Sequence, residues 1–141
     1  MRELQTICDD HNVIAILIPS DLPVEGARFI SPDDYPFQVG VLTHRAGSVL
    51  QAHSHAKIKI ETDIFQEILI LQLGRMEVDL YGLENQFLRS VVLEPGDAIL
   101  LVDGGHGVRM LADSRILEVK QGPYPGDKAA KVRFPSRKEN E

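Results

Sequence analysis

The feature that most constrains this chain is a succession of short apolar runs, each closed by a turn signal. The runs are rich in Val, Ile, Leu or aromatic residues and span residues 13–18, 37–43, 49–55, 58–62, 65–73, 75–81, 86–93, 98–102, 107–111 and 115–120. Residues of these types favour strands. Eleven glycines and eight prolines punctuate the chain as turn residues do. The pattern predicts about ten short antiparallel strands, most of them joined as hairpins.

Helical periodicity is poor throughout the sequence. Only the first ten residues, with Leu4, Ile7 and Cys8, offer one brief helical turn. The length of 141 residues fits a single domain, 1–141. An all-β barrel or jelly roll accommodates about ten short strands without long bare edges. We therefore expect a single-domain, all-β barrel.

Charge, hydropathy and cysteine content limit the classes of partner and the cellular location that we expect. The formal charge is -6 and the basic residues are scattered, so we expect no nucleic-acid partner. The longest apolar run, 13–18, is far shorter than a membrane span, so we expect no membrane partner. Cys8 is the single cysteine, which rules out an intrachain disulfide and favours a cytoplasmic location. The charged tail at 133–141 is expected to be frayed and solvated.

His53 and His55 are the first candidate metal ligands. On a strand, positions i and i+2 share a face, so two imidazoles there can chelate one ion. An exposed His-x-His pair also occurs without any metal. Gln51 shares the same face and is expected to contact a small ligand in the cavity, with a hydrogen bond to neighbouring backbone as the alternative.

Glu67 lies in a run that is apolar on both faces, and is therefore expected to be buried. A buried carboxylate needs a cation, either a metal ion or an Arg or Lys side chain. His106 follows two glycines, with Val108 and Met110 on its own side of the strand, so its surroundings are expected to be an apolar pocket. A hydrogen-bonded core histidine is the alternative. His11 and His44 are expected to lie at the surface.

Together these residues resemble the two motifs of the cupin superfamily. Gly47, His53 and His55 match the opening of the first motif, Glu67 and Gly74 match its close, and the second motif resembles Pro95-Gly96-Asp97 followed by Gly104-Gly105-His106. The resemblance covers residues 37–121, with the strand 13–18 and the tail 133–141 peripheral. It implies a cupin-type jelly-roll barrel in which His53, His55, Glu67 and His106 bind one divalent metal ion.

The spacing differs from the family pattern in one place. Eleven residues separate His55 from Glu67, where the family has only a few, so residues 57–63 form an insertion. Glu61 and Asp63 therefore remain rival carboxylate ligands. Met110 stands where many cupins have asparagine, and we expect it to contact the small-molecule substrate.

Three imidazoles and one carboxylate leave a divalent ion positively charged and with open positions. Zn, Fe, Mn and Ni all accept these ligands. The first hypothesis is a metal-dependent enzyme, an isomerase, epimerase or dioxygenase, acting on a small polar metabolite. Tyr81 and Lys120 are its candidate acid–base groups.

A narrower likeness suggests a sugar-derived substrate. The stretches 104–107 and 118–124 resemble small cupins found beside genes for sugar-nucleotide and surface-glycan synthesis. The alternative function is a non-catalytic metal-containing module that binds a small ligand and reports it to a protein partner. We expect a homodimer, with the strand 13–18 crossing between subunits or covering a sheet edge.

Overall fold

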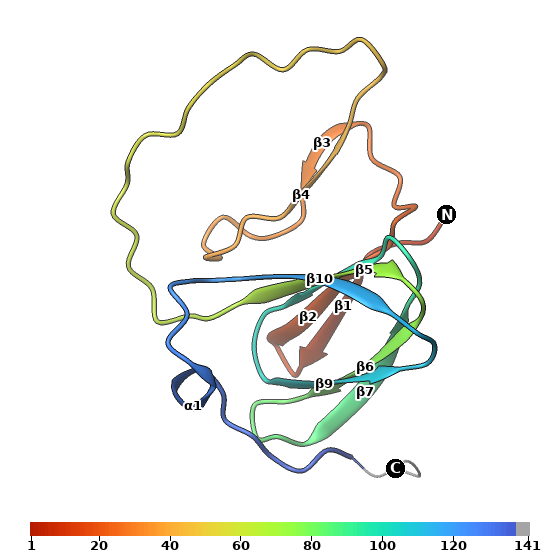
Figure 1. Ribbon diagram of the computed structural model, residues 1–141, viewed down its shortest axis with the longest axis vertical. Helices are drawn as coiled ribbons and strands as arrows, with labels where there is room; N and C mark the ends of the chain where they lie inside the picture. Colours follow the sequence, from red (N-terminus) through yellow and green to blue (C-terminus); the bar gives the residue numbers. More distant parts are fainter. Residues whose placement is uncertain (138–141) are drawn as a thin grey trace. The chain divides into compact units, whose positions relative to one another are not determined.

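The computed structural model describes residues 1–137, which form ten strands and one four-residue helical turn (Figure 1). The strands make three antiparallel sheets, so the all-β prediction is confirmed. The elements are β1 (Gln5–Asp9), β2 (Asn12–Ile18), β3 (Gly26–Phe29), β4 (Gly40–Thr43), β5 (Glu67–Leu73), β6 (Met76–Tyr81), β7 (Phe87–Leu93), β8 (Ala98–Leu101), β9 (Gly105–Met110), β10 (Arg115–Lys120) and α1 (Asp127–Ala130).

Contacts divide the chain into two compact units. Met1–Leu22 and the chain from Phe65 onward form the sheet unit, and Pro23–Ile64 forms the hairpin unit. The sheet unit contains a five-stranded sheet in the order β1-β2-β8-β5-β10 and a three-stranded sheet in the order β7-β6-β9. The hairpin unit contains the pair β3-β4. The prediction of a single domain stays a prediction, because a compact unit is not by itself an independently folding domain.

One apolar core joins the two sheets of the sheet unit. Strand alternation directs every second side chain inward, and the burial of alternate residues along β5 follows this rule. Both sheets contribute fully or almost fully buried side chains: Ile7, Ile14, Ala15, Leu17, Leu69, Leu71, Met76, Val78, Leu80, Val91, Leu93, Ile99 and Leu101. Burial of this apolar area is the main force that holds the sheets face to face.

Most turns in the sheet unit carry the chain from one sheet to the other. Hairpins join β1-β2, β3-β4 and β6-β7, and of these only β6-β7 was predicted. The chain instead changes sheet between β5 and β6, β7 and β8, β8 and β9, and β9 and β10. Gly74, with φ of +90°, makes the first of these crossings. The prediction of hairpins between most neighbouring strands is therefore wrong, because a turn signal does not specify which strand becomes the partner.

Two predicted strands, 49–55 and 58–62, are absent, since residues 44–66 form no strand in the described chain. Their apolar residues Val49, Leu50, Ile58 and Ile60 are all largely exposed. Strand propensity alone does not make a strand when no neighbouring strand pairs with it and no face is buried.

Three further segments near the N-terminus differ from expectation. The brief helical turn expected in the first ten residues is instead the strand β1, whose Ile7 is buried in the core. β3 has no counterpart among the predicted strands. β2, expected at the periphery, lies inside the five-stranded sheet between β1 and β8 and is buried along most of its length.

Asp97 organises the turn between β7 and β8. Its side chain is fully buried and accepts hydrogen bonds from both terminal nitrogens of Arg2, at 2.7 and 2.9 Å. The backbone amides of Ser20 and Glu94 donate to the same carboxylate at 2.9 and 3.0 Å. Burial alone would raise the pKa of Asp97, but these donors outweigh it and hold the pKa below its usual value.

We expect the protein to lose stability in acid through Asp97. A carboxylate with a lowered pKa in the folded state stabilises the fold well above pH 3.8, and this contribution is lost as the pH falls below that value. Urea unfolding between pH 3 and pH 7 measures the effect. The Asp97→Asn variant should be less stable at pH 7 and should show a shallower decline with acid. An equally steep decline in both proteins would contradict this assignment.

Candidate functional site

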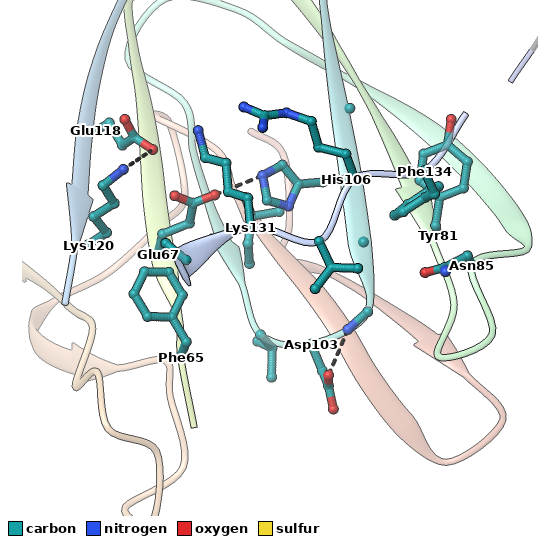
Figure 2. A pocket seen from close by; sticks show the side chains of 18 of the residues that line it. Phe65, Glu67, Tyr81, Asn85, Asp103, His106, Glu118, Lys120, Lys131 and Phe134 are labelled. Atoms are coloured by element: carbon teal, nitrogen blue, oxygen red, sulfur yellow. Dashed lines mark hydrogen bonds and ion pairs between the residues drawn. The ribbon is translucent and has the colours of Figure 1, made fainter. Parts of the chain in front are cut away.

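A pocket of about 650 Å³ lies in the sheet unit, and Figure 2 shows the side chains that line it. The lining includes seven acidic or basic side chains: Glu67, Asp103, His106, Glu118, Lys120, Lys131 and Arg133. Four of these are linked by short contacts: Glu67, His106, Glu118 and Lys120. Aromatic rings of Phe65, Tyr81, Tyr124 and Phe134 also line the pocket. It thus combines a polar cluster with apolar and aromatic walls, as small-molecule sites commonly do.

Strand register brings the polar cluster together. Glu67 is the first residue of β5 and lies directly opposite Lys120 on β10, so both side chains are on one face. Glu118 lies two residues before Lys120 and shares that face. His106 comes from β9 of the other sheet, opposite Leu80 of β6. The cluster therefore joins the two sheets at one end of their shared core.

The central contact is between Glu67 and His106. Glu67 Oε1 lies 2.8 Å from His106 Nε2 (Figure 2), and Glu67 is only 8% exposed. Glu118 makes a side-chain hydrogen bond with Glu67. Lys120 Nζ lies 3.8 Å from Glu118 Oε1 and 5.1 Å from the centre of the Tyr124 ring.

The pKa values of the Glu67 and Glu118 carboxyl groups are shifted in opposite directions. The hydrogen bond from His106 holds the pKa of Glu67 below its usual value, although burial opposes this. The hydrogen bond with Glu67, together with burial, raises the pKa of Glu118. Two carboxyl groups in hydrogen-bond contact share one proton most easily. Glu67 is thus the charged member beside His106, and Glu118 is the member that keeps the proton longer.

His53 and His55 lie in the hairpin unit, in the segment without strands. Their rings are neighbours, with centroids 5.2 Å apart, and both side chains are exposed. His53 Nδ1 is 2.9 Å from the backbone oxygen of Gln51. A carbonyl oxygen can only accept a hydrogen bond, so Nδ1 carries the hydrogen. In a neutral ring Nε2 then has a free lone pair that can bind a metal ion. Metal-binding histidines are commonly oriented in this way.

The remaining site candidates lie elsewhere. Gln51 is exposed in the hairpin unit. Of the rival carboxylates, Glu61 pairs with Lys59 at 2.6 Å and Asp63 is exposed, and neither lines the pocket. Met110 is half exposed on the same face of β9 as His106, but outside the pocket lining.

The structure brings Glu67 and His106 together within one unit. Within residues 1–137, no three His, Cys, Asp or Glu side chains are grouped closely enough to hold a metal ion. His53 and His55 belong to the other unit, so their approach to Glu67 and His106 stays a prediction.

Sequence reasoning missed Glu118 and the residues beyond Lys120. The bounds of β10 were predicted as observed, and Glu118 and Lys120 share a face at the i, i+2 spacing. That spacing was a usable signal, but only the pairing of β10 with β5 shows that the face is shared with Glu67. Tyr81 and Lys120, the two candidate acid–base groups, do line the pocket.

No protein-family model, curated protein or solved structure matches the chain. In the described part of the chain, no helix is long and apolar enough to cross a membrane.

Proposed function

We propose that the protein is a cupin-type metalloprotein that acts on a small polar metabolite. In this proposal the two sheets of the sheet unit close into a jelly-roll barrel, and Glu67, His106, His53 and His55 hold one divalent metal ion. The observation that carries the proposal is the meeting of Glu67 and His106, from opposite sheets, at 2.8 Å in a pocket of about 650 Å³.

The donor set fits such an ion. A carboxylate and an imidazole that converge in a pocket suit Zn, Fe, Mn and Ni. Glu67 is already the charged partner in its carboxyl pair, as a ligand must be. When bound, the ion would supply Lewis acidity toward a carbonyl or hydroxyl group or, if iron, oxygen chemistry.

The chain's own residues suit a polar substrate. Glu118 lies in contact with Glu67 and lines the pocket, so its carboxyl group can exchange a proton with a substrate oxygen there. Lys120 lies beside it and can hold an anionic or hydroxyl-bearing substrate group. The rings of Phe65 and Phe134 supply apolar surface to the pocket wall. These features favour isomerase, epimerase or dioxygenase chemistry on a hydroxylated metabolite, including one derived from a sugar.

Metal analysis tests the proposal. We expect protein purified without added metal to carry about one divalent ion per chain. The Glu67→Gln and His106→Ala variants and the His53→Ala, His55→Ala double variant should each bind it at least about 100-fold more weakly, since even residues behind the ligands contribute 10- to 100-fold.

Two controls separate a metal site from a general charge effect. Glu118→Gln changes a carboxyl in the same pocket, and His44→Ala removes an exposed histidine from the hairpin unit. His44→Ala should retain the wild-type metal affinity, whereas Glu118→Gln, which removes a hydrogen-bond partner of Glu67, should weaken metal binding by about 10-fold, less than the ligand variants do. Equal metal content in all variants would refute the site, and loss in the Glu118→Gln variant alone would assign the metal to another carboxylate.

A non-catalytic binding module is the second candidate, and one surface favours it. The outward face of β5 and β10 carries Ile68, Ile70, Leu117 and Val119, of which Leu117 and Val119 are nearly half exposed. Apolar sheet faces of this kind serve as protein contacts. Turnover of candidate metabolites by the metal-loaded protein would favour the enzyme, whereas saturable binding without turnover would favour the module.

A further inference from the structure

The C-terminal segment 130–137, here called the strap, forms one wall of the pocket. Nine of the 22 lining residues fall between Gln121 and Ser136, and the strap supplies six of these: Ala130, Lys131, Val132, Arg133, Phe134 and Ser136. Eight further lining residues belong to the strands β5, β6, β8, β9 and β10, which are held by ladder hydrogen bonds. Up to residue 137, the chain beyond β10 contains only the helical turn α1 and no strand.

Phe134 is the first anchor of the strap. Its ring packs edge-on against Tyr81, with the two centroids 5.0 Å apart and the planes at 79°. Gly105 makes room for it, because a Cβ at that position would lie 2.5 Å from Phe134 Cζ. The ring of Phe134 thus packs beside Tyr81 of β6 (Figure 2). Gly105 of β9 completes this seat for the ring.

Arg137 is the second anchor. Its backbone amide donates to Tyr81 Oη at 2.8 Å, and its guanidinium lies 3.0 Å from both Glu77 Oε1 and Asp79 Oδ1. The guanidinium also stacks over the Phe87 ring, 4.9 Å from its centre, and the side chain is only 10% exposed. The expectation of a frayed tail is therefore wrong for residues 133–137, while residues 138–141 lie outside the described chain.

We propose that the strap is a movable wall of the pocket, latched by Arg137, which opens for ligand exchange while the strands stay in place. The described part of the strap belongs to no strand ladder, and segments outside such ladders open locally at lower free energy than core strands do. Tyr81 connects the pocket with the latch, because its side chain lines the pocket and also contacts both Phe134 and Arg137. The gating part of this inference rests on the proposed metal site, whereas the latch itself does not.

Hydrogen exchange of the full-length, metal-free protein tests the latch. Arg137→Ala should speed exchange of the backbone amide of residue 137, which donates to Tyr81 Oη, at least tenfold and leave β5 and β6 unchanged. Arg109→Ala is the matched control, because Arg109 lies 3.5 Å from Glu77 and 2.9 Å from Asp79 but belongs to β9. Unchanged exchange in the strap of the Arg137→Ala variant, or equal acceleration by Arg109→Ala, would overturn the proposal.

A second variant guards against a folding defect in the first. Gly105→Ala should displace Phe134 while keeping the Arg137 contacts, and should also speed exchange in the strap. If neither variant speeds exchange there, the strap is a fixed wall and the proposal fails.

Release of Co²⁺ to a chelator, followed by stopped flow, tests gating. Arg137→Ala should raise the association and release rates of Co²⁺ by a similar factor of at least five, leaving the Kd within about threefold. The Arg109→Ala rates should match the wild type. Faster strap exchange with unchanged Co²⁺ rates would overturn the gating role. If the wild type binds no Co²⁺, the metal site fails, and the exchange rates still decide the latch.

Discussion

Replacing Gly74 by alanine is expected to destabilise the protein by about 3 kcal/mol. Gly74 has a φ of +90°, which costs a residue with a Cβ about 1–2 kcal/mol. A Cβ there would also overlap the backbone oxygen of Asp113 and the side chain of Ser114. Those atoms belong to the turn before β10 and have little freedom to move, so overlap adds roughly 1–3 kcal/mol. Urea unfolding followed by circular dichroism measures the loss.

Gly47→Ala is the matched control for Gly74→Ala. Gly47 has a φ of +86°, yet a Cβ at that position would meet nothing within 4 Å. Its loss should be at most about 1–2 kcal/mol, from the backbone conformation alone. Both glycines have a positive φ but only Gly74 is crowded, so the pair separates a steric requirement from a purely conformational one. Equal losses in the two variants would contradict the packing argument.

Asp97→Ala is expected to cost about 3–5 kcal/mol at pH 7, because two part-buried backbone amides lose their acceptor, at about 1–3 kcal/mol each. The substitution leaves the amides of Ser20 and Glu94 without their acceptor and Arg2 without its main partner. The resulting fall in melting temperature should be roughly 6–20 °C for a chain of this size. Calorimetry or thermal circular dichroism measures it.

Asp21→Ala is the control for Asp97→Ala. Asp21 pairs with the same Arg2 at 2.9 Å, but its side chain is 45% exposed. Exposed ion pairs contribute little, so the loss should stay below about 1 kcal/mol. A loss as large as that of Asp97→Ala would show that Arg2, rather than the buried carboxylate, holds this turn.

Strand propensity and turn residues predicted much of the sheet unit. β10 has the predicted bounds, and β5 to β9 agree with the predicted segments to within two residues at either end. The prediction of these strands is correct because each of them buries one face. The segments 49–55 and 58–62 have the same propensity but bury nothing, so the same reasoning failed there. β1 was missed because only Ile7 of its five residues is buried, too few to produce an apolar alternation.

The sequence predicted which residues belong to the candidate site better than it predicted how these residues are arranged in space. Glu67 and His106 were chosen from motif spacing, and the structure places them in contact. Glu118 was not chosen, because its position depends on the register between β5 and β10, which sequence spacing does not give. The strap was missed for a similar reason: the seat for Phe134 is formed by residues that lie far from it in the chain.

The contact between Phe134 and Gly105 limits which substitutions the protein can accept at these two positions during evolution. Any residue with a Cβ at position 105 would displace the ring at 134, so the two positions are expected to vary together. His106, one residue away, faces Glu67 on the other side of the strand and is under a separate constraint. A lineage that abandoned the strap could therefore lose Phe134 and Gly105 while keeping Glu67 and His106, leaving an open pocket with the same polar cluster.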